Sequence, residues 1–160
     1  MMISEFLSEA PIKIGLEARN KTAAIEEMID LLVSDHQISL ANRGSVIEAV
    51  MKREQMISTG MEHGVAIPHG AVDSVDDIVA AMGVSRDGID FQSIDGRPTY
   101  IVILLILPSN KYSSSVQAMA GISRVLTSPQ IRKSIIEATS SDALLDCILE
   151  EEERLLLSRE

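Results

Sequence analysis

An unbroken run of aliphatic residues, Ile101–Leu107, is the strongest constraint on how this chain folds. A strand with one exposed face alternates apolar and polar residues, whereas a strand buried on both faces reads as continuous apolar sequence. The run is far shorter than the roughly 20 residues that span a bilayer, and Pro108 ends it. We therefore predict a central strand over Tyr100–Leu107 that is covered on both faces by helices.

The periodicity of the remaining sequence predicts helices and further strands around this strand. Apolar residues at helical spacing predict helices over Thr22–Ser34, with Thr22 as cap, and over Ser45–Arg53. Further helices are expected over Ser115–Thr127, after the Ser128 cap with Pro129 in the first position, and after Ser141. Extended segments are expected at Val65–Ile67 and Ile78–Val84, with turns at Arg86–Gly88 and Asp95–Gly96. The predicted fold class is α/β, a layered domain.

Composition agrees with one compact domain over residues 1–160. The chain is 46% hydrophobic and 24% charged, which is enough for one core and short for two. The N-terminus lacks the basic and apolar regions of a signal peptide, and no segment is expected to enter a membrane. The lone cysteine, Cys147, shares a helical face with Leu144 and Ile148, so we expect a small core residue in a reducing, cytoplasmic protein.

The formal net charge of −10 argues against nucleic acid as a partner. Binding to DNA or RNA depends on neutralising phosphates with a basic stripe, and the sequence has none. An acidic surface suits a basic protein partner. The acidic run Glu150–Glu153 is interpreted as a solvated helix face without a role.

The segment from Gly64 to Gly70, Gly-Val-Ala-Ile-Pro-His-Gly, places His69 between a proline and a glycine. Pro68 restrains the chain on one side, and the glycines allow close approach of another group. Near neutral pH such an imidazole can act as a nucleophile and carry a covalent group. The alternative is a histidine that only ends a strand.

The residues upstream of His69 favour the nucleophilic role over a histidine that only ends a strand. Arg53-Glu54 is followed by Ser58-Thr59-Gly60, and the passage from Arg53 to Gly70 resembles the signature of fructose/mannitol-type enzyme IIA domains of the bacterial phosphoenolpyruvate-dependent phosphotransferase system, including their nitrogen-regulatory members. The resemblance extends to Asp95–Pro98, to the strand at Tyr100–Leu107 and to the amphipathic stretch Val116–Leu126. It implies a mixed sheet flanked by helices.

The resemblance also implies an activity and its partners. His69 would take a phosphoryl group on Nε2 from HPr or its nitrogen-related counterpart and pass it on, with Arg53 stabilising the phosphate. No metal or organic cofactor would be needed. The partner after this step would be a separate IIB component, or a regulated target protein if the chain works as a regulatory binding module through contact.

Three further residues are weaker candidates for the phosphate site. Thr59 could offer its hydroxyl or only stabilise the turn, and Gly70 could allow close approach of a bound group. Ser115 stands where many family members have a second histidine, and it could offer a hydroxyl and a helix N-terminal N–H. His63 could be a second imidazole or a metal ligand with Asp73, but we expect an exposed turn residue, with no metal site.

Overall fold

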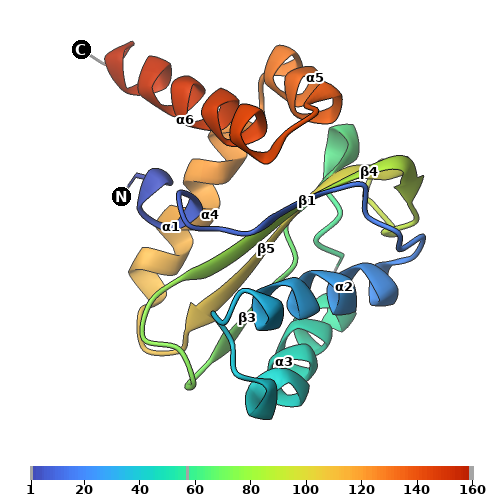
Figure 1. Ribbon diagram of the computed structural model, residues 1–160, viewed down its shortest axis with the longest axis vertical. Coiled ribbons are helices and arrows are strands. Elements are labelled where there is room, and N and C mark those ends of the chain that lie inside the picture. Colours follow the sequence, from blue (N-terminus) through green and yellow to red (C-terminus); the bar gives the residue numbers. More distant parts are fainter. Residues whose placement is uncertain (1, 57, 159–160) are drawn as a thin grey trace.

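A five-stranded sheet forms the middle layer of the protein within residues 2–56 and 58–158, the part described by the computed structural model (Figure 1). The helices are α1 (Ser4–Leu7), α2 (Lys21–Ser34), α3 (Arg43–Met56), α4 (Tyr112–Val125), α5 (Pro129–Glu137) and α6 (Ser141–Leu157). The strands are β1 (Ile12–Ile14), β2 (Val65–Ala66), β3 (His69–Val72), β4 (Val79–Ile89) and β5 (Thr99–Pro108), and short 3-10 turns cover Leu40–Asn42 and Glu62–Gly64. The predicted α/β class is confirmed.

The sheet is mixed, and β5 lies at its centre. On one edge β5 pairs antiparallel with β4, which in turn pairs in parallel with β1. On its other edge β5 pairs in parallel with β2 and then with β3, so these two short strands follow one another along the same neighbour. The mixed sheet that the resemblance implies is confirmed.

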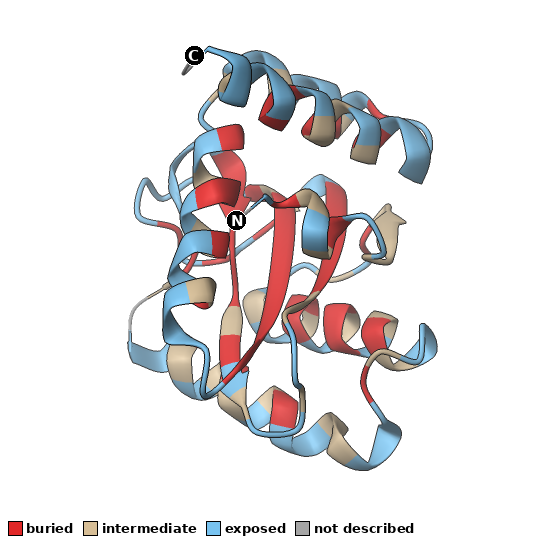
Figure 2. Ribbon diagram, turned by 90° about the vertical axis from the view of Figure 1, so that its left-hand side faces the viewer, coloured by how far each residue is buried: buried red, intermediate tan, exposed pale blue. Residues whose placement is uncertain are grey.

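Side chains of β5 alternate between two hydrophobic cores, because successive residues of a strand point to opposite faces. One core lies under α1, α4, α5 and α6 and contains Ile101, Ile103, Leu105 and Leu107; the other lies under α2 and α3 and contains Val102, Leu104 and Ile106. Figure 2 shows the buried strands between helices whose outer surfaces are exposed. The aliphatic run is apolar throughout because both of its faces are covered, as predicted.

Two predicted helix starts are wrong by a few residues. Asn20, not Thr22, caps α2, and its side-chain oxygen accepts the Ala23 N–H at 2.9 Å. The helix α4 begins at Tyr112, three residues before the predicted Ser115. The first turn of α4 consists of Tyr112 and three serines, which show no apolar periodicity, so the sequence pattern places the helix start one turn too late.

Other features of the helices are confirmed. Ser128 caps α5 by accepting the Ile131 N–H, and Pro129 occupies the first helical position. Cys147 packs partly buried against the core near Ser134 of α5, and burial raises the pKa of its thiol, which favours the protonated form. In the described part of the chain, no helix combines the length and the apolar character needed to cross a membrane.

The predicted turn at Arg86–Gly88 is wrong, because β4 continues through it to Ile89. The pairing with β5 changes register between Val84 and Ile89, which is the signature of a bulge. Gly88 has a φ of +90° and would, with a Cβ, come within 2.9 Å of the Pro98 side chain. The glycine therefore bends a strand instead of ending it.

The interpretation of Glu150–Glu153 as a solvated face is also wrong for its two central residues. Glu151 and Glu152 are buried. The Glu152 carboxylate accepts the backbone N–H groups of Ile3 and Ser4 at the start of α1, and Glu151 accepts a hydrogen bond from Arg154 Nε at 2.9 Å. A carboxylate that satisfies free N–H groups at a helix start is stabilised there, so Glu152 joins α6 to the N-terminal segment.

Candidate functional site

His69 is the first residue of β3, and the edge of β5 determines where it lies. Pro68 separates β2 from β3, and its carbonyl oxygen accepts the Leu105 N–H at 3.0 Å, so the two strands remain on one line beside β5. His69 is in register with Leu105, whose side chain belongs to the core under α4. Residues in register share a face of the sheet, so His69 points toward the side covered by α4 and is half-buried there.

Gly70 explains how α3 reaches the site. A Cβ at this position would lie 2.8 Å from the backbone nitrogen of Val50 and 3.0 Å from the carbonyl carbon of Ala49. The missing side chain therefore lets the backbone of α3 lie directly on β3, which brings the C-terminal half of the helix to the sheet edge at His69. In this structure the close approach predicted for Gly70 is made by the chain itself; contact of Gly70 with a bound group stays a prediction.

The imidazole of His69 is held in one orientation. Its Nδ1 lies 3.0 Å from the carbonyl oxygen of Ile67. A carbonyl oxygen can only accept, so Nδ1 carries the proton, and the lone pair of the neutral ring is on Nε2. This orientation leaves Nε2 accessible to a reacting group, and its attack on phosphorus stays a prediction.

Burial lowers the pKa of His69 below its ordinary value of 6.5. The hydrogen bond to the Ile67 carbonyl acts in the opposite direction, while the positive charge of Arg53 lowers the pKa and the negative charge of Glu54 raises it. The net effect favours the neutral ring at pH 7. A neutral ring is the form that can attack phosphorus.

Arg53 lies near the C-terminal end of α3 and is half-buried. Its charge acts on the His69 ring, which agrees with the predicted proximity of the two side chains. A guanidinium is permanently charged and presents a planar fork of donors, so it suits the oxygens of a phosphoryl group bound to the ring. Its role as a phosphate ligand remains a prediction.

Glu54 connects the turn at Thr59 to α2, although the sequence identified it only as the residue that follows Arg53 in the motif. Its side chain is 1% exposed, and it accepts the Thr59 backbone N–H at 2.8 Å and the Thr59 hydroxyl at 2.5 Å. The Lys21 ammonium lies 3.2 Å from the same carboxylate. Lys21 begins α2, far from Glu54 in sequence, and no pattern pointed to it.

The turn at Ser58–Gly60 is fixed by side-chain hydrogen bonds. Thr59 is buried, and its hydroxyl donates to Glu54. The Ser58 hydroxyl donates to the Phe91 carbonyl oxygen at 2.8 Å, and its oxygen accepts the Gly60 N–H at 3.0 Å. These bonds agree with turn stabilisation, one of the two roles considered for Thr59; contact with phosphate stays a prediction.

Ser115 lies on α4, the helix that covers the same face of the sheet toward which His69 points. It is buried, and both its N–H (3.1 Å) and its hydroxyl (2.8 Å) donate to the Lys111 carbonyl oxygen. The expectation of a free helix N-terminal N–H at Ser115 is therefore wrong, because the helix starts one turn earlier. A role for the hydroxyl beside the phosphate stays a prediction.

His63 is exposed, has a φ of +67°, and its ring lies 3.7 Å from the Glu62 carboxylate. It is a turn residue, as predicted. The Asp73 carboxylate, considered as its metal partner, accepts a hydrogen bond from Ser109. Among the described residues, no three histidine, cysteine or acidic side chains gather into a potential metal site.

Comparison with known proteins agrees with these features over nearly the whole chain. A family model for "Phosphoenolpyruvate-dependent sugar phosphotransferase system, EIIA 2" matches residues 5–151. The fructose-specific EIIABC component of Bacillus subtilis is 36% identical over 148 residues, 92% of this chain but 23% of that protein. The fructose-specific EIIA component of Haloferax volcanii is 29% identical over 153 residues, 94% of this chain and 98% of that protein.

The fold has a similar counterpart in a solved structure. The nitrogen regulatory protein IIA-Ntr of Neisseria meningitidis superimposes with a TM-score of 0.78 at 25% sequence identity, covering 88% of this chain and 93% of that one. The helix-flanked mixed sheet, the Arg53–Gly70 signature and the extent of the family match lead to one assignment. The chain belongs to the EIIA 2 family of the phosphoenolpyruvate-dependent sugar phosphotransferase system.

Proposed function

We propose that this protein is a cytoplasmic phosphocarrier that accepts a phosphoryl group on Nε2 of His69 from an HPr-like protein. It passes the group to a separate IIB component, or signals by it. The observation that carries the proposal is the hydrogen bond from Nδ1 to the Ile67 carbonyl oxygen, which leaves the lone pair on Nε2 of a ring kept neutral by burial. The name of the Bacillus relative joins A, B and C components, which supports a IIB component as the next acceptor here.

The transfer step follows from this geometry. The Nε2 lone pair of His69 attacks phosphorus, and the new N–P bond forms as the N–P bond of the donor phosphohistidine breaks. The donor ring, protonated on its other nitrogen, leaves as neutral imidazole with that electron pair, and the phosphoryl group carries its three oxygens to His69. Arg53 offsets the negative charge on those oxygens. Nδ1 of His69 keeps its proton and its bond to the Ile67 carbonyl throughout.

A regulatory binding module is the second candidate. The specific observation is Ser115, whose hydroxyl and N–H are both bonded to the Lys111 carbonyl, at the position of a second histidine in many family members. The similarity in fold to a nitrogen regulatory protein agrees with it. Two observations distinguish the candidates. Transfer of phosphate to a IIB component would support the phosphocarrier, and control of a target by a non-phosphorylatable variant would support the regulatory module.

The direct test is incubation with phosphoenolpyruvate, enzyme I and HPr, followed by detection of phosphohistidine over a range of pH. The initial rate is expected to rise with pH and to level off, with a midpoint below 6.5, because burial lowers the pKa of His69. The unfolded chain binds more protons than the folded one between the lowered and the ordinary pKa, so stability should also fall as pH drops through that window. A midpoint above 6.5 would contradict the buried, neutral ring.

Replacement of Arg53 tests charge stabilisation separately. A charge-assisted hydrogen bond to an anion is worth about 1.5 to 3 kcal/mol, so Arg53→Ala should slow phosphoryl acceptance roughly 10- to 100-fold. Lysine should rescue only in part, because it cannot bind two oxygens with a planar fork. The loss of the Arg53 charge should also raise the pKa of His69, which NMR titration of the ring measures.

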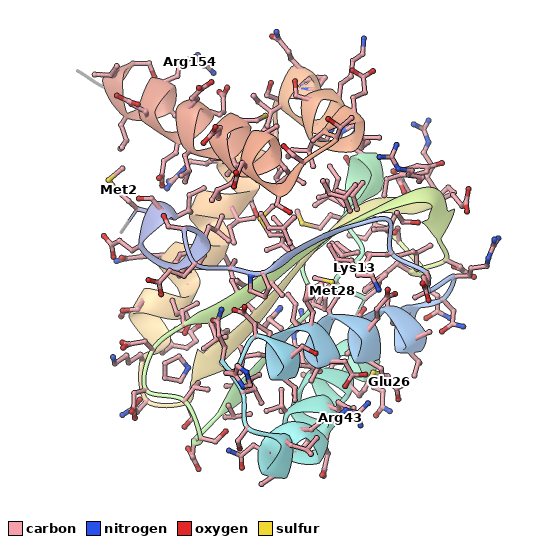
Figure 3. The ribbon with its side chains drawn as sticks, in the orientation of Figure 1. Met2, Lys13, Glu26, Met28, Arg43 and Arg154 are labelled. Carbon is pink, nitrogen blue, oxygen red and sulfur yellow. The ribbon has the colours of Figure 1, made fainter. Side chains whose placement is uncertain are left out.

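Arg43 provides the control for this experiment, because it lies on the same helix and pairs with Asp30 at the surface (Figure 3). It precedes Arg53 by ten residues, or about 15 Å along the helix axis. Arg43→Ala should therefore leave the transfer rate unchanged. If Arg53→Ala instead lowered the melting temperature while the folded protein accepted phosphate normally, Arg53 would be a structural residue.

A further inference from the structure

Lys21, the first residue of α2, has its ammonium enclosed by three partners. Nζ lies 3.2 Å from Glu54 Oε1 and donates to Gln92 Oε1 at 2.9 Å. It also lies 5.9 Å from the centre of the Phe91 ring. The side chain is 14% exposed, so these contacts replace most of its hydration. A long, flexible side chain is thereby held in one position at the end of α3.

The Glu54 carboxylate connects Lys21 to the turn at Ser58–Gly60, which precedes His69 in the sequence. Besides Lys21, its oxygens accept the backbone N–H and the hydroxyl of Thr59. A buried carboxylate needs several donors to remain charged, and Lys21 supplies the only full positive charge among the contacts described for it here. The position of Thr59 thus depends on a carboxylate that Lys21 holds.

The chain of hydrogen bonds continues from the turn to the reactive ring. The Thr59 carbonyl oxygen accepts the Ile67 N–H at 3.2 Å, and the Ile67 carbonyl oxygen accepts Nδ1–H of His69 at 3.0 Å. Each hydrogen bond is direct, and the covalent backbone of Thr59 and of Ile67 joins one bond to the next. The polar groups of α2, α3, the turn and the strand therefore form one connected network that ends on the nitrogen of His69 that does not react.

We infer that Lys21 is a positioning residue for His69: through Glu54 and Thr59 it holds the Ile67 carbonyl that fixes the Nδ1–H tautomer of the ring. The inference rests on the proposed function, since it is the availability of Nε2 for phosphoryl transfer that Lys21 protects. A group that orients the second nitrogen of a histidine sets which nitrogen is free.

Electrostatics point in the same direction. The Glu54 charge raises the pKa of His69, and the Lys21 ammonium offsets part of that charge at 3.2 Å. Without Lys21, the ring should bind a proton more easily and be less available as a nucleophile. Loss of Lys21 therefore acts on His69 twice, through the tautomer and through the charge.

A matched control separates this role from simple stabilisation of α2. The Lys13 ammonium lies 2.7 Å from the carboxylate of Glu27, which is on α2 like Lys21. Glu27 also accepts the backbone N–H groups of Glu17 and Ala18. This second pair likewise joins a lysine, a carboxylate and a backbone segment. Lys13 is the middle residue of β1 and its ammonium binds Glu27 of α2 (Figure 3), and no described contact leads from it to His69.

The experiment compares Lys21→Met with Lys13→Met by NMR of protein labelled with ¹⁵N in its histidine rings, together with the rate of phosphoryl acceptance from phospho-HPr. In Lys21→Met, the share of the Nδ1–H tautomer of His69 should fall, its pKa should rise, and acceptance should slow about tenfold. Lys21→Arg should restore the tautomer and most of the rate. Lys13→Met should leave all three quantities at wild-type values.

A folded Lys21→Met protein with the wild-type tautomer, pKa and rate would overturn the inference and make Lys21 a structural residue. If Lys21→Met does not fold, Lys21→Gln, which can still donate to Glu54 but has no charge, takes its place, and an unchanged His69 pKa and tautomer there would equally overturn it. Failure of the proposed function looks different: wild-type protein would take up no phosphate, while the tautomer of His69 would still respond to Lys21.

Discussion

His69→Ala is expected to take up no phosphate from phosphoenolpyruvate, enzyme I and HPr, while the wild-type protein gains a label that is labile to acid and stable to alkali. This stability pattern is that of a phosphoramidate. The loss should be complete, because the substitution removes the imidazole nitrogen to which the phosphoryl group would be bound. The expected effect is therefore larger than that of any charge-stabilising residue.

The control for this experiment is His63→Ala, which removes the other histidine of the same segment. His63 is exposed in a turn, and its ring faces the Glu62 carboxylate. We expect full labelling of this variant, with acid lability unchanged. Full labelling of His69→Ala would refute the assignment of the acceptor, and loss of label in His63→Ala alone would move the acceptor to the turn.

Glu54→Ala should cause the largest loss of stability among the site substitutions. The Thr59 N–H and hydroxyl would lose their acceptor inside the protein, and Lys21 would lose its counter-charge. Removal of one partner from a buried pair typically costs about 3 to 5 kcal/mol, since the groups left behind can no longer be hydrated. Urea denaturation monitored by circular dichroism measures this change in the free energy of unfolding.

Glu48 lies on the same helix but is exposed, so Glu48→Ala is the control. It should change the free energy of unfolding by no more than about 0.5 kcal/mol. A loss at Glu54 as small as that at Glu48 would show that water replaces the carboxylate at Thr59 and Lys21. The turn would then owe its geometry to Ser58 and Phe91 instead.

The architecture could be read from the sequence wherever burial leaves a pattern along one segment. The aliphatic run of β5 predicted a strand with two covered faces, and helical periodicity predicted α2 and α3, because each signal is carried by residues close in sequence. The short strands β1 and β3 escaped prediction. Three or four residues are too few to show a period, and their extended state depends on pairing with β4 and β5.

Charge and capping were harder to predict than apolar burial. The acidic run at the end of α6 reads as solvated, yet Glu152 is buried because the N–H groups at the start of α1 lie next to it in space. The start of α4 was likewise missed, so Ser115 was credited with an N–H that already bonds to Lys111. A polar residue can belong to a helix cap, a turn or the exposed surface. Which of these it occupies depends on its hydrogen-bond partner, and the sequence does not identify that partner.

The sequence by itself determined the family, the α/β class and His69 with Arg53 as candidate site residues, because a motif is local and its chemistry belongs to the residue types. Only the tertiary structure decided which nitrogen of His69 is free, that Gly70 is small so that α3 can lie on β3, and that Glu54 joins Lys21 to Thr59. These features depend on distances between segments that are remote in sequence. Hydrogen bonds and Coulomb interactions act over a few ångströms in space, and folding alone brings their partners within that range.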